Sequence, residues 1–240
     1  MTGGPTTAEL AEIAGRRSST WWLLSRLVIE QPQEPWLGEL GAVLAAIDSD
    51  EQTPLGAESA SLLSALGSVR GQPDGLIALA VDRTRLLAGV LQKEGLPAPY
   101  ESTVLDLPMN SDLVIDVTEC YREAGLEDFG RELGPPDFLG TELRFMALLS
   151  YHEMQAHQAD DAGLAAQWLA RQRHFLDQHL LCWLPTHCER LSKMAKTPFY
   201  AALFTLLGQA CSLDRSDLDQ VAHFLAHELA VDAVAAETRQ

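Results

Sequence analysis

Two carboxylates at the start of one predicted helix are the side chains in this sequence best placed to do chemistry. Asp137 and Glu142 follow Pro135-Pro136, and apolar residues recur at helical spacing after them. Asp137 has two possible roles, capping the free amides of that helix or accepting a hydrogen bond from a charged ligand. Glu142 falls on or beside the apolar face, where its charge requires a cation or a hydrogen-bond donor.

Three side chains are candidate partners for Glu142. They are Arg83, Arg85 and Tyr100, of which the arginines would neutralise the charge and the tyrosine would donate a hydrogen bond. A satisfied buried glutamate at an ordinary helix start would need no ligand, so this pairing alone does not define a functional site.

The longest predicted irregular connection runs from residue 95 to residue 110. It contains Pro99-Tyr100-Glu101-Ser102 and, further on, the apolar Leu105. A connection of this length inside a helical domain is usually functional or disordered. Its aromatic and apolar side chains favour order, and the sequence therefore predicts a functional loop near 95–110.

Histidines and cysteines gather in residues 174–188, and His223 and His227 have the i, i+4 spacing that places two imidazoles on one helix face. No HExxH, CxxC, GxSxG, Walker A or GxGxxG pattern accompanies them. We therefore predict no catalytic residue and no metal ligand. A metal-dependent helical enzyme built on this second half is the alternative from another class of protein.

Charge and cysteine content exclude several partners. The formal net charge is −17, which disfavours nucleic acid and favours a basic peptide, although acidity can also serve solubility alone. Four irregularly spaced cysteines do not form a disulfide framework, so a reducing cytoplasm fits best. No apolar run is long enough to insert in a membrane. Arg16-Arg17 superficially matches a twin-arginine export signal, but Ser25 and Arg26 interrupt the apolar stretch, and we place the pair inside a first helix.

Alanine and leucine dominate the apolar residues, which favours helix over strand. We predict an all-α protein, one domain over 1–240 built as a bundle of about nine or ten helices, with a possible hinge near 131–137. The predicted helices span 7–30, 35–48, 54–69, 74–92, 111–124, 137–157, 161–184, 186–195, 198–211 and 215–236. Thr6 with Glu9, Thr197-Pro198 and Asp214 are the clearest predicted starts.

Several stretches, in this order along the chain, resemble the TorD-like family of redox-enzyme maturation chaperones, which includes the DmsD and NarJ types. Pro99-Tyr100-Glu101-Ser102 matches the family's PYES, and the block from Pro136 to Met146 matches its PDH…ELEFM. The other similar stretches are 20–27, 82–89, 175–183 and 199–200. Two positions depart from the family pattern: Phe138 stands where a histidine is frequent, and Leu87 replaces an aromatic residue.

The resemblance implies an all-helical cytoplasmic chaperone without enzymatic turnover. Its implied partner is the catalytic subunit of a molybdopterin oxidoreductase, bound through an N-terminal twin-arginine leader and held as apo-enzyme until the molybdenum cofactor is inserted. In this interpretation Asp137 accepts a leader arginine and Glu142 is structurally supported by Arg83 and Arg85. The leader-binding residues are expected to be Pro99, Tyr100, Glu101, Ser102, Leu105, Asp137, Phe138 and Glu142.

Several alternatives stay open on the sequence. A NarJ-like chaperone would serve a non-exported or membrane-attached subunit whose leader lacks the twin arginines. A plain interaction module unrelated to redox enzymes is a third class. No cofactor is expected, although weak contact with the molybdopterin cofactor or a guanine nucleotide is possible, and both monomer and homodimer are compatible with the sequence.

Overall fold

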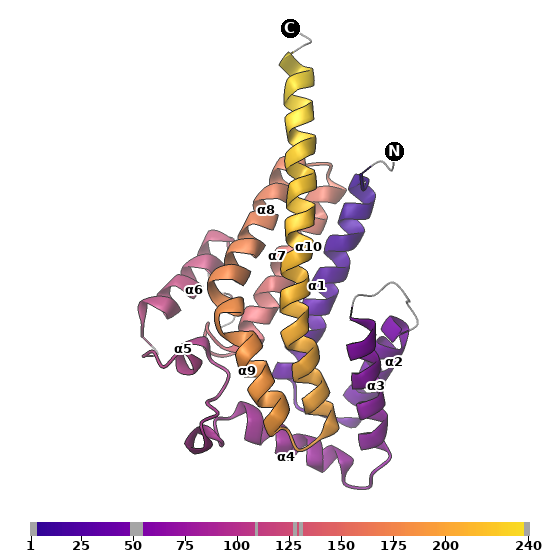
Figure 1. Ribbon diagram of the computed structural model, residues 1–240, viewed down its shortest axis with the longest axis vertical. Coiled ribbons are helices and arrows are strands. Elements are labelled where there is room, and N and C mark those ends of the chain that lie inside the picture. The colour runs from indigo at the N-terminus through magenta and orange to yellow at the C-terminus, as the bar shows by residue number, and fades with distance from the viewer. Residues whose placement is uncertain (1–3, 49–54, 109, 127–128, 130–131, 238–240) are drawn as a thin grey trace.

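The computed structural model describes the backbone of residues 4–48, 55–108, 110–126, 129 and 132–237, and the side chains within this set except 46–48 and 227–237. This part of the chain is helical and contains no strand, which confirms the predicted all-α class (Figure 1). The α-helices are α1 (Thr7–Ile29), α2 (Glu34–Asp48), α3 (Gly56–Arg70), α4 (Gly75–Leu87), α5 (Glu101–Val104), α6 (Asp112–Glu123), α7 (Leu139–Gln158), α8 (Ala162–Phe175), α9 (Leu181–Met194) and α10 (Pro198–Glu237). A 3-10 turn, η1 (Gln92–Glu94), and a π-helical turn, η2 (Leu176–Leu180), complete the set.

Two helix starts follow directly from local sequence. The Thr6 hydroxyl accepts a hydrogen bond from the Glu9 amide at 3.3 Å, and the Glu9 carboxylate accepts from the Thr6 amide at 2.7 Å, so the predicted capping box begins α1. Pro198 is the first residue of α10, and the Thr197 hydroxyl accepts from the Tyr200 amide at 3.4 Å. The twin arginines lie inside α1, as the sequence predicted.

Two predicted helix breaks are wrong. The predicted break at 184–186 is absent, because α8, η2 and α9 follow one another directly from Ala162 to Met194. Asp214 does not begin a helix either, since α10 runs through it without interruption. Its carboxylate instead accepts a hydrogen bond from the Trp21 indole at 3.2 Å, and this tertiary partner replaces the capping role.

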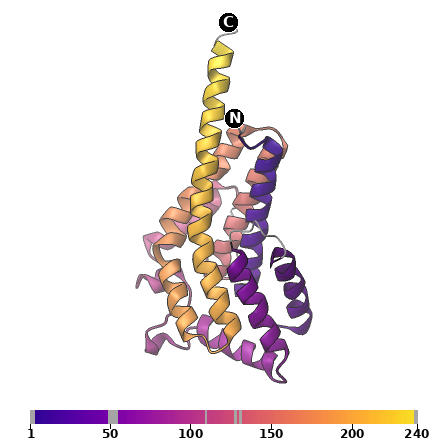
Figure 2. The same ribbon diagram turned by 45° about the vertical axis from the view of Figure 1, so that its right-hand side comes forward.

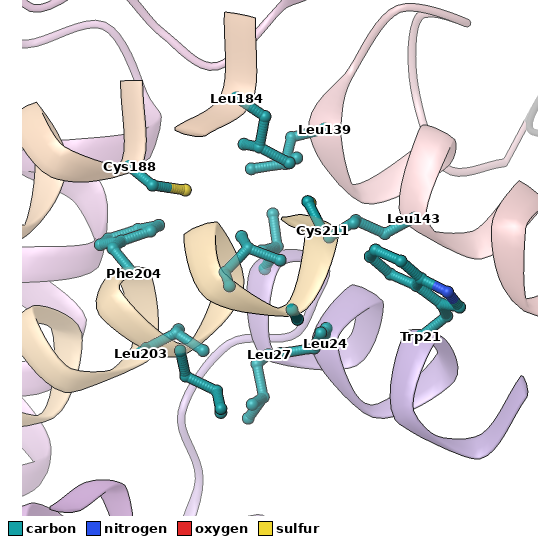
Figure 3. Packing of buried hydrophobic residues seen from close by; sticks show 14 of the residues in the cluster. Trp21, Leu24, Leu27, Leu139, Leu143, Leu184, Cys188, Leu203, Phe204 and Cys211 are labelled. Atoms are coloured by element: carbon teal, nitrogen blue, oxygen red, sulfur yellow. The ribbon is translucent and has the colours of Figure 1, made fainter. Parts of the chain in front are cut away.

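The core lies along α10, which packs against α9, α3 and α8, and along α7, which packs against α1 and α8 (Figures 1 and 2). The helices α1 and α7 are antiparallel neighbours. The Ser18 hydroxyl donates a hydrogen bond to the Ala147 carbonyl, and the Ser25 hydroxyl, further along α1, donates to the Gly140 carbonyl, which comes earlier on α7. Side chains from four helices meet in this core: Trp21, Leu24, Leu27, Leu139, Leu143, Leu184, Cys188, Leu203, Phe204 and Cys211 (Figure 3). None of the described helices is both long enough and apolar enough to cross a bilayer.

The segment 95–108 is ordered and pairs with the start of α7. The Leu139 amide donates to the Pro99 carbonyl at 3.0 Å, and the Glu101 amide donates to the Asp137 carbonyl at 2.9 Å. These two bonds flank an isolated antiparallel bridge between Tyr100 and Phe138. The two segments that the sequence singled out are therefore joined backbone to backbone. Of the hinge expected near 131–137, residue 131 lies outside the described residues.

Candidate functional site

The backbone crossover at Tyr100 and Phe138 is the centre of the candidate site. The two rings lie with their centroids 5.4 Å apart, and both side chains are half-buried. The neighbouring Pro99 is buried, whereas Leu105 and Leu107, just past α5, are 37% and 41% exposed. Two half-buried aromatic rings at the crossover are thus followed along the chain by two exposed leucines.

Asp137 faces the protein interior. It is 3% exposed, and its carboxylate accepts hydrogen bonds from both the amide and the hydroxyl of Ser102, with the amide at 3.2 Å. The prediction that Asp137 caps its own helix is wrong: Phe138 is the capping residue of α7, and the Asp137 carboxylate caps the first turn of α5. The reason is the crossover, which brings the free amides of α5 to this carboxylate. The Asp137 carboxylate is therefore turned toward α5 and is nearly closed to solvent.

Glu142 is fully buried, as the helical spacing predicted. Neither carboxylate oxygen has a hydrogen-bond partner among the described residues. Burial, followed by the negative charges of Glu101 and Asp137, raises the pKa of Glu142 well above its usual value. A raised pKa favours the neutral form of the Glu142 carboxyl, and a neutral carboxyl needs no cation.

The expected pairing of Glu142 with Arg83 or Arg85 is therefore wrong. Arg83 donates instead to the carbonyls of Val28 and Ile29 at the end of α1, at 2.7 and 2.8 Å. Arg85 pairs with Asp82 at 2.7 Å.

The Asp82 carboxylate also accepts from the Thr197 amide at 2.7 Å, ahead of α10. The stretch from Asp82 to Arg85 therefore has a structural role, because it joins α4 to the end of α1 and to the start of α10.

His179 belongs to the site, although we did not predict it as a site residue. Its Nδ1 lies 3.1 Å from the Glu101 carboxylate, and its Nε2 lies 3.6 Å from Asp116 and 3.8 Å from the Cys120 sulfur. The imidazole is 1% exposed and extends from η2. Two sequence signals pointed to this stretch: the resemblance over 175–183 and the histidines and cysteines gathered in residues 174–188.

A stripe of four carboxylates on α6 was also missed. Asp112, Asp116, Glu119 and Glu123 recur at helical spacing on one face. Burial, followed by the charges of Asp116, Glu123, Glu101 and Glu119, raises the pKa of the Cys120 thiol to about 12. Three of the four carboxylates of the stripe, together with the buried Glu101, therefore act on this thiol. The signal was present in the sequence as carboxylates at i, i+4, i+7 and i+11.

A shallow hollow opens where α6 meets η2. It has a volume of about 350 Å³ and is lined by Asp112, Leu113, Asp116, Gln178 and His179. Ile115, on the outer side of α6, is 64% exposed. Within the described residues no group of three or more His, Cys, Asp or Glu side chains is arranged to hold a metal ion. The surface as a whole suits a ligand with both positive charge and apolar side chains.

Comparison with known proteins defines the class. Residues 48–189, which contain both motif segments, α6 and His179, match the family described as nitrate reductase delta subunit. The chaperone protein TorD of Vibrio cholerae is 26% identical over 219 residues, covering 89% of this chain and 96% of the relative. No solved structure gave a significant match.

Two further relatives match over shorter lengths. The perchlorate reductase assembly chaperone protein of Dechloromonas aromatica is 32% identical over 117 residues, which cover 46% of this chain and 50% of the relative. The selenate reductase assembly chaperone protein of Thauera selenatis is 39% identical over 103 residues, covering 42% and 50%. The fold and these relatives together define a chaperone, not an enzyme. The chain belongs to the nitrate reductase delta subunit family, of the TorD and NarJ type.

Proposed function

We propose that this protein is a cytoplasmic, system-specific chaperone for the catalytic subunit of a molybdopterin oxidoreductase. In this proposal it binds the N-terminal leader of that subunit and holds the apo-enzyme until the molybdenum cofactor is inserted, before export or assembly. The observation that carries the proposal is the match to the chaperone TorD over 96% of that protein's length. The reductase assembly chaperones among the relatives support an oxidoreductase as client.

The leader would bind on the surface formed by the crossover and α6. Leu105 and Leu107 are exposed apolar side chains that follow Tyr100 closely along the chain, and they suit the hydrophobic part of a leader. The carboxylate stripe of α6 suits its arginines, because charge complementarity steers a basic peptide to an acidic surface.

The buried members of the predicted site would act by positioning this surface. Asp137 holds α5 through Ser102, and Glu101 holds His179, so their exposed fractions of 3% and 0% are consistent with an indirect role. Glu142 is fully buried, and the charges of Glu101 and Asp137 act on its carboxyl, so it would also act from within the fold. In this proposal Asp137 supports the binding surface and does not itself bind a leader arginine.

Calorimetric titration with a synthetic leader peptide that carries twin arginines before an apolar stretch tests the proposal. Tyr100→Ala should weaken binding by about 2 kcal/mol or more, the usual effect of removing an aromatic anchor. Tyr151→Ala is the matched control, since Tyr151 is 42% exposed on α7 and lies outside the proposed surface. Leader binding that Tyr100→Ala leaves unchanged would remove this surface from the proposal, and wild-type protein that binds no leader would contradict the function.

The NarJ-like alternative predicts a different dependence on salt. If carboxylates steer twin arginines, association should slow as ionic strength rises, because screening limits the field to about 8–10 Å near physiological salt. Stopped-flow measurement of the association rate at several salt concentrations checks this. An association rate independent of salt would favour a purely apolar groove and a leader without twin arginines.

A further inference from the structure

Gly140 lies in the first turn of α7, two residues after the capping Phe138, and its backbone gives no reason for a glycine there. Alanine forms helix more readily than glycine, because glycine loses more conformational freedom when it is fixed. The left-handed backbone that only glycine adopts easily is not needed at Gly140. Among the described residues, the glycines with a positive φ are Gly89, Gly95, Gly125 and Gly134.

The space around Gly140 supplies the reason. A Cβ atom at this position would lie 2.5 Å from Ile29 Cγ1, at the end of α1, and 2.7 Å from the ring carbon Cε1 of Phe138. Both distances are far below the 3.5–4.0 Å or so at which two carbon atoms are normally in contact. The bare backbone at Gly140 therefore allows the end of α1 and the Phe138 ring to approach one point.

Hydrogen bonds hold the backbones on both sides of this contact. The Ile29 carbonyl accepts from Arg83 at 2.8 Å, and the Gly140 carbonyl accepts from the buried Ser25 hydroxyl at 2.8 Å. Ile29 is also branched at Cβ, which restricts its χ1 rotation in a helix. The half-buried Phe138 ring is thus the group that would move first if a methyl group were added at Gly140.

The Phe138 ring is also the aromatic partner of Tyr100. The two ring centroids lie 5.4 Å apart, and the ring planes make an angle of 43°. Such aromatic pairs depend on the relative position of the two rings. A turn of the Phe138 ring would therefore change the support of Tyr100, which is the aromatic anchor of the proposed leader surface.

We propose that Gly140 and Ile29 are positioning residues of the leader-binding surface. Gly140 leaves the room in which Ile29 fixes the Phe138 ring, and that ring in turn holds Tyr100. This inference rests on the proposed function, since the leader is the ligand that Tyr100 would bind. It adds the end of α1 to the elements that shape the site, although Ile29 lies 71 positions before Tyr100 in the sequence.

Proton nuclear Overhauser spectra of the aromatic rings in the free protein test the positioning without a ligand. The wild type should show cross-peaks between Tyr100 and Phe138, and Gly140→Ala should weaken or displace them. Gly163→Ala is the matched control. Gly163 is also two residues after a helix cap, on α8, but the nearest atom to its Cβ position is Asp161 Oδ1 at an ordinary 3.5 Å. Wild-type cross-peaks in Gly140→Ala would overturn the inference.

A compensating substitution distinguishes positioning from a general defect. Leucine is not branched at Cβ, so in Ile29→Leu with Gly140→Ala the side chain at 29 can turn away from the new methyl group at almost unchanged volume. This double variant should recover the cross-peaks between Tyr100 and Phe138. If Gly140→Ala does not fold, the double variant carries the test, and a folded double variant without the cross-peaks would contradict the proposal.

Titration calorimetry with a synthetic twin-arginine leader peptide measures the effect on binding. Gly140→Ala should weaken binding by about two- to tenfold, the range that the geometry of an aromatic pair contributes. Gly163→Ala should bind as the wild type does, and the double variant should bind more tightly than Gly140→Ala. The rescue is decisive, because a variant that merely loses stability would not regain affinity through Ile29→Leu.

The two measurements separate this inference from the proposed function. If the wild type binds no leader peptide, the proposed function fails, and the ring spectra still decide whether Gly140 and Ile29 position Phe138. If the wild type binds the peptide and Gly140→Ala loses the ring contact but keeps wild-type affinity, the leader does not depend on this contact. That result would overturn the inference and leave the proposed function intact.

Discussion

Glu142 and Glu153 lie on the same helix, α7, and are both 1% exposed or less, yet their surroundings shift the two pKa values in opposite directions. Burial and neighbouring carboxylates raise the pKa of Glu142 well above its usual value. Burial also acts against the charge of Glu153, but His157 at 3.6 Å and the Arg17 guanidinium outweigh it and hold the pKa of Glu153 below its usual value. One end of α7 buries a carboxyl whose surroundings favour the neutral form, and the other buries an ion pair.

The two ends differ because only one has a buried cation. Around Glu153, the Arg17 guanidinium also donates a hydrogen bond to Gln172 at 2.9 Å and lies 3.4 Å from Asp214. Residues of four helices thus share one network in which a buried cation offsets the buried negative charges. Around Glu142, the described residues supply carboxylates and a histidine but no arginine. A compensated network holds the bundle together, whereas an uncompensated acidic cluster beneath an exposed surface is typical of a site awaiting a partner.

The largest expected effect comes from removing the buried cation. Arg17→Met should lower the free energy of unfolding by about 3–5 kcal/mol, because Glu153 and Asp214 would stay buried without their partner. Urea unfolding measures the change. Arg16→Met is the control, since Arg16 pairs with Glu12 at the exposed surface, and it should change stability by less than about 1 kcal/mol. Similar losses for the two variants would show that the network is not the main source of stability.

The next effect is a pH dependence at the other carboxylate of the network. Burial raises the pKa of Asp214 to about 6 from 3.8, with Arg17 opposing. Between these pH values the folded state binds more protons than the unfolded state, so the contribution of Asp214 to stability falls as pH rises, by up to about 3 kcal/mol. Asp214→Asn should therefore lose less stability than the wild type between pH 4 and pH 7, as urea unfolding at both values would show. Parallel profiles of unfolding free energy against pH for the two proteins would contradict the raised pKa of Asp214.

A smaller loss is expected where the acidic cluster holds the crossover. Ser102→Ala removes the hydroxyl that donates to the buried Asp137 and leaves the Ser102 amide in place. Stability should fall by about 1–2 kcal/mol, measured by thermal unfolding. Ser19→Ala, whose hydroxyl bonds the Gly15 carbonyl within α1 at an exposed position, should change it by less than about 0.5 kcal/mol. A silent Ser102→Ala would mean that the amide alone holds Asp137.

The smallest effect is expected at Glu142 itself. Because its surroundings raise the pKa of Glu142 and so favour the neutral carboxyl, Glu142→Gln should change stability at pH 7 by less than about 1 kcal/mol or increase it, whereas Glu153→Gln should cost about 3 kcal/mol. The raised pKa of Glu142 also means that its contribution falls as pH rises above 4.5, and the variant should lack this decline. A large loss in Glu142→Gln at pH 7 would show that Glu142 is charged and paired.

Local sequence determined where most helices begin and which faces they bury. The capping box at Thr6, the proline at the start of α10 and the burial of Glu142 were all predicted from spacing alone. The order of the two motif segments likewise indicated the family, which the match over residues 48–189 confirmed. These features depend on residues within a few positions of one another, which is the range that helical periodicity and capping report.

Only the tertiary structure decided the partners of the buried polar groups. Asp137 bonds Ser102 across 35 positions of sequence, Glu101 bonds His179 across 78, and Asp82 bonds Thr197 across 115. Charge type made Arg83 a reasonable partner for Glu142, but Arg83 lies against the carbonyls that end α1. A buried donor or acceptor bonds whichever complementary group the packing of distant helices brings within reach, and a local pattern carries no record of that packing.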